Sequence, residues 1–347
     1  MQDKPLLIKS ILGEEISRPP VWLMRQAGRY MSEYRALKEK YTFLELCRTP
    51  ELALEVTMQP INFLDPDAAI IFSDILIPLE SLGFEIDFNP GPKVANPIRD
   101  ESDVNNIPNN TKTVLHTSNS LKLVRKELEK LAKEKGTQRK ALLGFSGAPW
   151  TLACYVIDQQ NYKGFLGTKI FASRYRKAMH KFLERIALTT ADYLLSQIEA
   201  GADAVQIFDS WGGILNEEQY KEFSAPYINI IIEKLRVKNT PIILYTNGGD
   251  HLLKQIKELK ADCVSIDWRT SLSKAEEIFG NDICIQGNLD STSLFKDKEE
   301  LKQEINKMLS GLTRKTRYIA NLGHGILPRT PPENVATFVN LVKAFHF

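Results

Sequence analysis

Short runs of apolar and β-branched residues recur along the whole chain and predict buried strands. Eight such runs occur, and most are continuous rather than alternating, as in strands buried on both faces: residues 20–24, 68–73, 141–146, 203–208, 241–246, 263–268, 283–288 and 317–322. Amphipathic helical patterns lie between most of them, clearest at 173–200, at 217–234 with an interruption at Pro226, and at 299–309. Eight strand-helix repeats predict an α/β fold, a (β/α)8 (TIM) barrel.

An open, doubly wound sheet is the alternative architecture for this alternation. The dinucleotide-binding form of that fold is disfavoured because no GxGxxG motif follows the first run. Residues 85–112 break the alternation with several prolines and a polar stretch, which predicts an irregular insertion in a βα loop. Because no linker is apparent, we expect residues 1–347 to form a single barrel domain.

Composition narrows the classes of partner. The chain has 347 residues, is 43% hydrophobic and carries a formal net charge of +2, so its bulk charge gives no reason to expect nucleic-acid binding. No apolar stretch approaches membrane-spanning length, and no signal peptide is apparent. The four cysteines form no CxxC pair and are expected to be reduced, which favours a cytoplasmic protein.

The residues that follow the predicted strands are unusually polar. In a barrel, catalytic groups come from the C-terminal ends of the strands. Those ends carry Arg25-Gln26, Ser73-Asp74, Ser146-Gly147, Asp209-Ser210, Asn247-Gly248, Asp267-Trp268, Asn288 and Gly323-His324-Gly325. Each alone is also typical of a turn that stops a strand. Eight polar ends at one rim together predict a ligand site.

Arg25 and Arg29, separated by Gly28, are the first candidates. Two guanidiniums suit a ligand with several carboxylates, because the planar fork binds a carboxylate through two hydrogen bonds. Isolated surface arginines commonly have no such role. Asp74 follows the most apolar run, so it is either a partly desolvated functional carboxylate or the N-cap of a helix.

Two further candidates also allow a structural interpretation. His324 lies between two glycines, whose bare backbone lets a histidine approach a ligand closely, although loop histidines often have no role. Tyr155 follows Thr151 by one helical turn and either places its hydroxyl at the mouth of the site or belongs to the core.

Several segments together resemble the uroporphyrinogen decarboxylase family. Residues 20–35, PVWLMRQAGRYMSEYR, are similar to the first signature of that family, and residues 144–155, GFSGAPWTLACY, to the second. Further matching segments are IIFSDIL at 70–76, IFDSWGG at 207–213 and NLGHGILP at 321–328. The resemblance spans essentially the entire chain.

The resemblance implies a (β/α)8 barrel that pairs as a homodimer. It implies a carboxy-lyase that removes carboxyl groups stepwise from the four acetate side chains of uroporphyrinogen III, giving coproporphyrinogen III in porphyrin (heme) biosynthesis. It also implies that no metal or organic cofactor takes part, and that the partners are this substrate and a second copy of the chain, with no nucleic acid or membrane.

The resemblance also implies roles for particular residues. Arg25, Arg29, Asp74 and Tyr155 are expected to be catalytic, with the arginines on substrate carboxylates, Asp74 facing the pyrrole N–H groups and Tyr155 contacting an acetate. The substrate-binding residues are expected to be Arg25, Gln26, Ala27, Gly28, Arg29, Asp74, Tyr155, Phe208, Ser210 and His324.

The chain departs from the family pattern at two places. Asp158-Gln159-Gln160 stands where the family usually has an acidic residue followed by glycines, which predicts a loop of different shape. The fifth predicted strand ends in Asn247-Gly248, where the family often has Lys-Gly, so one positive charge near the rim is expected to be missing.

Three other functions remain open at this point. A zinc- and corrinoid-linked methyltransferase of the same barrel superfamily needs a His-x-Cys pair, and none of the five histidines is followed two residues later by cysteine. A serine hydrolase would use Ser146 in GFSGA with His324 as base, but the spacing departs from a nucleophile elbow. A non-catalytic porphyrin-binding protein would use the same residues, and only turnover separates it from the enzyme.

Overall fold

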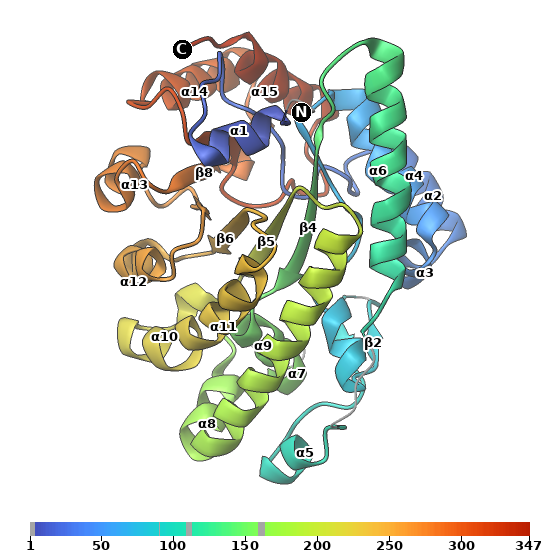
Figure 1. The fold of residues 1–347 in the computed structure, drawn as a ribbon, viewed down its shortest axis with the longest axis vertical. Coiled ribbons are helices and arrows are strands. Elements are labelled where there is room, and N and C mark those ends of the chain that lie inside the picture. The colour runs from blue at the N-terminus through green and yellow to red at the C-terminus, as the bar shows by residue number, and fades with distance from the viewer. Residues whose placement is uncertain (1–3, 90, 109–112, 159–163) are drawn as a thin grey trace.

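The computed structural model describes residues 4–89, 91–108, 113–158 and 164–347. Its centre is one curled sheet of seven parallel strands with helices outside it (Figure 1). In spatial order the strands are β1 (Ala68–Ile70), β4 (Ala141–Gly147), β5 (Ala204–Asp209), β6 (Ile242–Thr246), β7 (Cys263–Ser265), β8 (Cys284–Leu289) and β9 (Tyr318–Leu322). Spatial order follows chain order, as in a sheet that winds around an axis.

The first predicted strand, residues 20–24, does not become a strand. Val21 forms one isolated parallel bridge to Ala320 of β9, and the carbonyl of Val21 accepts the N–H of Asp67 at 2.7 Å, next to β1. The segment therefore lies between the last and first strands without a regular ladder, and a closed eight-stranded barrel is not shown. Pro19 and Pro20 explain part of the difference, since proline has no N–H to donate to a neighbouring strand.

The other seven predicted strands are confirmed. Two of them are three residues shorter than predicted, since β1 ends at Ile70 and β7 ends at Ser265. The predicted helices are also present, as α9 (Arg176–Glu199), α10 (Glu217–Phe223), α11 (Ala225–Arg236) and α14 (Lys298–Ser310). The interruption falls at Ser224 rather than at Pro226, because proline fits the first turn of a helix and so begins α11.

The remaining helices complete the outer layer. The α-helices are α2 (Ser32–Lys40), α3 (Phe43–Arg48), α4 (Pro50–Leu64), α6 (His116–Lys135), α7 (Pro149–Asp158), α8 (Leu166–Arg174), α12 (Leu253–Glu258), α13 (Leu272–Phe279) and α15 (Pro332–Ala344). Short 3₁₀ helices follow several strands, at η1 (Ile77–Leu82), η2 (Gly212–Ile214), η3 (Asp250–Leu252) and η4 (Ser291–Phe295).

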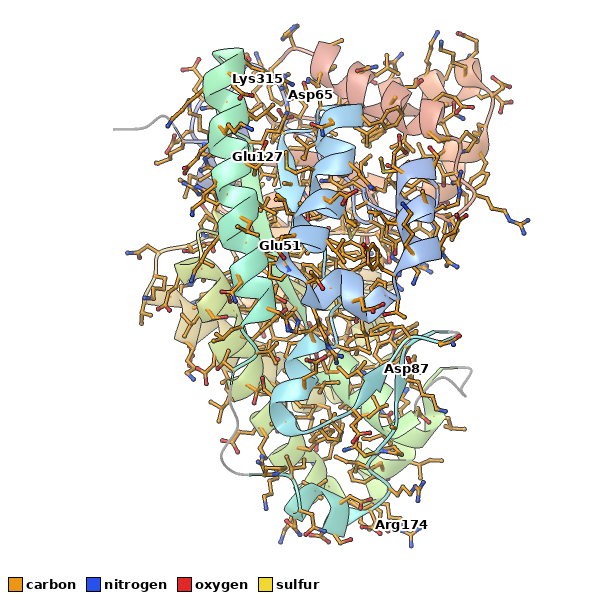
Figure 2. All side chains as sticks on the ribbon, turned by 90° about the vertical axis from the view of Figure 1, so that its right-hand side faces the viewer. Glu51, Asp65, Asp87, Glu127, Arg174 and Lys315 are labelled. Atoms are coloured by element: carbon orange, nitrogen blue, oxygen red, sulfur yellow. The ribbon has the colours of Figure 1, made fainter. Side chains whose placement is uncertain are left out.

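The segment predicted as an irregular insertion, residues 85–112, is partly regular. It contains the antiparallel pair β2 (Ile86–Asp87) and β3 (Lys93–Val94), followed by α5 (Glu101–Asn105), while residues 90 and 109–112 lie outside the described residues. Figure 2 shows Asp87 of this segment and Arg174 of α8 toward one end of the molecule, away from Asp65, which precedes β1. The insertion therefore extends from the end where the strands finish.

Helix α1 (Leu6–Leu12) covers the opposite end of the sheet. Leu7, Ile8 and Ile11 are buried in one apolar cluster with the first residues of several strands, among them Ala68, Ala141, Ala204, Cys263 and Cys284. Small side chains at the strand starts leave room for the helix against the inside of the curl. With this end filled, the end where the strands finish is the one left for a ligand.

Three aspartates directly before strands share one bonding pattern at the end covered by α1. Each carboxylate accepts the backbone N–H of a residue at the start of the neighbouring strand or segment and also binds an arginine, at distances of 2.7 to 2.8 Å. The sets are Asp67 with Val21 and Arg18, Asp203 with Leu142 and Arg139, and Asp262 with Ile242 and Arg236. In these three sets Val21 donates its N–H to the aspartate as the strand residues Leu142 and Ile242 do in theirs.

Two expectations on environment can be compared with the structure. All four cysteines are buried and none is in a disulfide. Among the described residues, no helix combines the length and the apolar character needed to cross a bilayer.

Candidate active site

Arg25 enters the rim from the segment that bridges β9 and β1. Its φ angle is 61°, a left-handed conformation that is uncommon outside glycine, and its side chain is exposed. The side chain crosses Gly325, where an added Cβ would lie 2.5 Å from the Cδ of Arg25. The bare backbone of Gly325 therefore leaves room for the Arg25 side chain where it crosses the loop after β9.

Gln26 fixes the backbone that carries Arg25. The side chain is buried, its Oε1 accepts the N–H of Leu23 at 3.2 Å, and its Nε2 donates to the carbonyl of Ala68 in β1 at 3.1 Å. These bonds give the Gln26 amide a structural role. The backbone is bonded as well, since the Gln26 N–H donates to the carbonyl of Leu23 at 3.0 Å and the Gln26 carbonyl accepts the Tyr30 hydroxyl at 2.7 Å. Ala27 and Gly28, the next predicted contacts, are half-buried.

Asp74 lies in the turn between β1 and η1. Its Oδ1 accepts the N–H of Leu76 at 2.9 Å, a turn bond to the second residue along the chain. The alternative that Asp74 caps a helix is wrong, because the N-cap residue of η1 is Leu76. The Oδ2 of Asp74 has no hydrogen-bond partner among the described residues. Burial raises the pKa of Asp74 to about 6, while the Leu76 N–H and the charge of Arg25 act against the rise. One carboxylate oxygen is therefore available to a ligand, within electrostatic reach of Arg25.

Tyr155 on α7 forms an aromatic group beside that carboxylate. Its ring centre lies 5.9 Å from Phe165 and 6.2 Å from Trp211. Burial raises the pKa of the Tyr155 hydroxyl, Asp74 adds to the rise, and Trp211 and Arg25 oppose it. Tyr155, Asp74 and Arg25 therefore lie within electrostatic reach of one another.

Phe208 and Ser210 come from the end of β5. The Phe208 ring packs edge-on against Phe145, with ring centres 5.6 Å apart, and lies 5.8 Å from Tyr245 of β6. Tyr245 is buried and donates its hydroxyl to the carbonyl of Gly323 at 3.0 Å. Phe208 therefore belongs to an apolar floor, while Ser210 is half-buried at its edge.

His324 lies in the loop after β9, half-buried. Its ring lies edge-on to Trp268 with centres 6.4 Å apart, and its carbonyl accepts the Ser291 hydroxyl at 3.0 Å. Burial lowers the pKa of His324, and the charges of Arg25 and Arg269 lower it further. The imidazole is therefore mostly uncharged at neutral pH, and its Nδ1 lies 3.4 Å from the carbonyl of Gly325, so the single N–H of the neutral ring points at the backbone.

Arg29 stands apart from this group. Its side chain is exposed, and its carbonyl accepts a hydrogen bond from Arg35 at 2.9 Å. Burial raises the pKa of Tyr34 to about 12, and the charge of Arg29 acts against that rise, which locates the guanidinium near Tyr34. No contact of Arg29 with Asp74 or Tyr155 occurs among the described residues. Arg29 is a charge on the outer rim.

Several of the polar strand ends serve the fold instead. Asp209 is fully buried and accepts hydroxyl hydrogen bonds from Thr151 at 2.8 Å and from Ser224 at 2.7 Å. Asn288 donates its amide to the carbonyl of Asp267 at 2.9 Å. For these residues the interpretation as structural polar groups is the correct one, and sequence alone did not separate them from Asp74.

The serine-hydrolase alternative does not fit the position of Ser146. The side chain is fully buried within β4, and its hydroxyl donates to the carbonyl of the next residue at 3.2 Å. A nucleophile elbow instead exposes its serine at a turn. Among the described residues, no three or more His, Cys, Asp or Glu side chains form a cluster that could hold the zinc ion of the methyltransferase alternative.

The two predicted departures also have structural outcomes. Asp158 is buried and accepts hydrogen bonds from the N–H and hydroxyl of Thr168 at 2.6 and 2.8 Å, so it closes the turn into α8. Gln159 and Gln160 lie outside the described residues. Asn247 accepts a hydrogen bond at its Oδ1 from Arg269 at 3.3 Å. A positive charge therefore stands next to Asn247, where the sequence predicted that one was missing.

Comparisons with known proteins point to one family. The model of the uroporphyrinogen decarboxylase (URO-D) family matches residues 2–345. A uroporphyrinogen decarboxylase of Geobacter sulfurreducens is 42% identical over 336 residues, 96% of each chain, and one of Christiangramia forsetii is 40% identical over 344 residues, 98% of each.

Solved structures extend the likeness at the level of the fold. A methyltransferase from Methanosarcina mazei has a TM-score of 0.78 at 19% identity, covering 98% of this chain and 97% of the other. A B12-independent methionine synthase from a Shewanella species has a TM-score of 0.55 at 13% identity, covering 98% of both chains. At these identities the likeness concerns the architecture alone.

Proposed function

Because the chain belongs to the uroporphyrinogen decarboxylase family, whose members are carboxy-lyases, we propose that its rim site decarboxylates the acetate side chains of uroporphyrinogen III to give coproporphyrinogen III. The observation that carries the proposal is the partly free carboxylate of Asp74, beside Arg25 and Tyr155. An anion to face ring nitrogens and a cation to hold a carboxylate are the two groups that this reaction needs.

The pyrrole ring provides the electron sink. A proton added to a ring carbon next to nitrogen makes the ring a cation. The bond between the acetate methylene and its carboxyl group then breaks, carbon dioxide leaves, and the bonding electrons neutralise the ring. The methylene carbon takes up a proton and becomes a methyl group, and the proton first added to the ring is lost. This sequence requires no metal or organic cofactor, and we propose that none is used.

Asp74 stabilises the charged ring in this scheme. Its carboxylate is largely ionised at pH 7, because its pKa of about 6 lies below that pH. It accepts hydrogen bonds from pyrrole N–H groups before reaction and interacts more strongly as the ring becomes positive. Interactions that strengthen in the transition state are the ones that accelerate a step.

The other residues hold the substrate. Arg25 binds a carboxylate through its guanidinium, a group that is a poor proton donor. Tyr155 contacts the reacting acetate, and His324 lies against a further carboxylate. Phe208 lies against the macrocycle and Ser210 at its edge, while Arg29 attracts the anionic substrate from the outer rim.

The assembly and location are part of the proposal. We infer a homodimer and a cytoplasmic enzyme, and buried cysteines without disulfides are in keeping with a reducing compartment. We also infer that residues 1–347 act as one barrel domain, in which the segment around Val21 takes the position of the eighth strand. Sedimentation at micromolar concentration tests the dimer, and a monomer there would contradict it.

An anaerobic turnover assay tests the activity. The purified protein is mixed with uroporphyrinogen and a chelator, and the products are oxidised and separated by carboxyl number. Stepwise loss of carboxyl groups down to the coproporphyrinogen level supports the proposal. Tight binding without turnover by the folded protein favours the non-catalytic porphyrin-binding alternative.

A further inference from the structure

Arg269 presents a fixed guanidinium that none of the expected roles uses. Its Cζ lies 4.0 Å from the centre of the Trp268 ring, and its side chain is 48% exposed. One nitrogen, Nη1, donates to Asp267 at 2.7 Å and to Asn247 at 3.3 Å. Nε and Nη2 have no hydrogen-bond partner in the described part of the chain. Stacking and pairing hold the group in place, while a pair of donors stays available.

Gly323 brings this guanidinium to the rim of the site. An added Cβ at Gly323 would lie 2.4 Å from the backbone nitrogen of Trp268, so only glycine allows the chain after β7 to approach the end of β9. The Trp268 ring reaches the His324 ring as a result, with centres 6.4 Å apart. Gly323 and Gly325 therefore admit one arginine-bearing segment on each side of His324.

The charges of Arg25 and Arg269 act on the same two side chains. Burial lowers the pKa of His324, and both guanidiniums lower it further, while Asp267 opposes them. Burial and Asp267 raise the pKa of the Tyr245 hydroxyl, and both guanidiniums act against that rise. Asp267, the counter-ion of Arg269, is 2% exposed, whereas about half of the arginine side chain faces solvent. A ligand at the rim can therefore contact the Arg269 guanidinium, whereas the Asp267 carboxylate is covered.

We propose that Arg269 binds a carboxylate of the substrate at the ends of β6 and β7, separate from the carboxylate held by Arg25. The inference rests on the proposed function and adds a second anchoring guanidinium to the site. A fork fixed by Trp268 and Asp267 loses little conformational freedom on binding, which favours a two-bond contact with a carboxylate. The ring of His324, beside Trp268, adds no third positive charge here.

The test compares Arg269→Gln with Arg236→Gln. Both substitutions remove a partly exposed arginine from an aspartate that flanks β7. Asp267, the partner of Arg269, follows the strand, whereas Asp262, the partner of Arg236, precedes it at the end covered by α1. We expect Arg269→Gln to raise the KM for uroporphyrinogen roughly tenfold and to leave kcat within about twofold, because a charge-assisted contact is lost in binding. Arg236→Gln leaves both constants unchanged, and thermal melting checks that each variant is folded.

A charge-retaining variant separates binding from a purely structural role. Arg269→Lys preserves the pair with Asp267 but lacks the planar fork, so its KM is expected between those of the parent and Arg269→Gln. A wild-type KM in folded Arg269→Gln overturns the proposal while the activity itself stands. If Arg269→Gln does not fold, Arg269→Lys decides, and a parent-like KM in it overturns the proposal.

Failure of the proposed function is distinguishable from failure of this inference. If the parent protein shows no turnover, the same variants are titrated with uroporphyrin, the stable oxidised octacarboxylate, by fluorescence quenching. Weaker binding by Arg269→Gln, with parent-like binding by Arg236→Gln, supports the anchor without the reaction. Equal affinity in all three proteins overturns it.

Discussion

The two ends of the sheet use aspartate in opposite ways. Before the strands, Asp67, Asp203 and Asp262 each combine a backbone N–H with an arginine at 2.7 to 2.8 Å. After the first strand, the carboxylate of Asp74 accepts a single hydrogen bond, from the backbone N–H of Leu76. The cation that acts on it, Arg25, does so through its charge and not through a hydrogen bond. The same side chain is satisfied at one end and left partly unsatisfied at the other.

This difference separates folding from chemistry. A carboxylate with an arginine and an N–H pins two neighbouring strands and has little left to offer a ligand. A carboxylate crowded by protein, with one oxygen free, has a raised pKa and gains when a donor or a cation arrives. Barrel-like enzymes place catalysis at the C-terminal ends of the strands and stability at the other end, and the pairing of these aspartates follows that division.

Asp74→Asn is the strongest test of this contrast. We expect kcat to fall on the order of 10²- to 10³-fold, because the charged ring loses its counter-charge, while the free energy of unfolding stays close to that of the parent. Anaerobic initial rates and urea unfolding measure the two quantities. Asp209→Asn is the matched control, since burial also raises the pKa of Asp209 to about 6 but its oxygens bind Thr151 and Ser224. Equal losses of kcat in both variants would contradict the separation.

Asp203→Asn tests the opposite end. This carboxylate binds Arg125 and Arg139 and an N–H of β4, so its removal is expected to cost about 3 kcal/mol of unfolding free energy. The folded fraction keeps a parent-like kcat. Asp192→Asn, which loses an exposed pair with Lys234, is the comparison and should cost less than about 1 kcal/mol. A large drop in kcat for Asp203→Asn at full folding would show that the two ends are not independent.

The acidic limb of the pH profile follows from Asp74. Its pKa is raised to about 6 in the folded protein, so kcat/KM should fall about tenfold per pH unit below 6 as the required carboxylate takes up a proton. The linkage to stability has the opposite direction. A raised folded-state pKa means that this group favours folding most at low pH, and the contribution declines as pH rises from about 4 to about 6. Steady-state rates of the parent and of Asp74→Asn, measured across this pH range, test the assignment, because the variant should lack the acidic fall in kcat/KM.

Arg29→Ala should have the smallest effect. The exposed side chain lies near Tyr34 rather than Asp74, so we expect KM to rise only a few-fold, with kcat unchanged and the difference shrinking at high ionic strength. Arg25→Ala is the comparison and should raise KM more, since Arg25 acts on Asp74, Tyr155 and His324. An equal effect of the two variants would place Arg29 inside the site.

Sequence alone predicted the repeating part of the fold well. Continuous apolar runs marked seven strands, and helix periodicity located α9 and α14, because both signals are local. The prediction of a strand around Val21 was wrong, because the hydrogen-bond partners of this segment lie far along the chain and leave it with a single bridge. The expectation that Arg25, Asp74, Tyr155 and His324 meet came from recognised motifs rather than from spacing.

Side-chain partners explain what the sequence did not reveal. Asp74 and Asp209 both follow a strand, and only the positions of Thr151 and Ser224 show that the second is structural. The glycines around His324 were expected to clear space for a ligand. In the structure they clear space for Trp268 and Arg25, two neighbours that no local pattern could identify.

The single bridge at Val21 also bears on motion. Every other neighbouring pair in the curled sheet shares a ladder, whereas this seam depends on a few bonds around Val21 and on the amide of Gln26. Amide hydrogens there should exchange with solvent earlier than those of β5 or β6, because opening the seam breaks fewer contacts. Arg25 lies a few residues after this seam along the chain. A carboxylate bound to Arg25 should therefore stabilise the segment around Val21 and slow the exchange of its amide hydrogens.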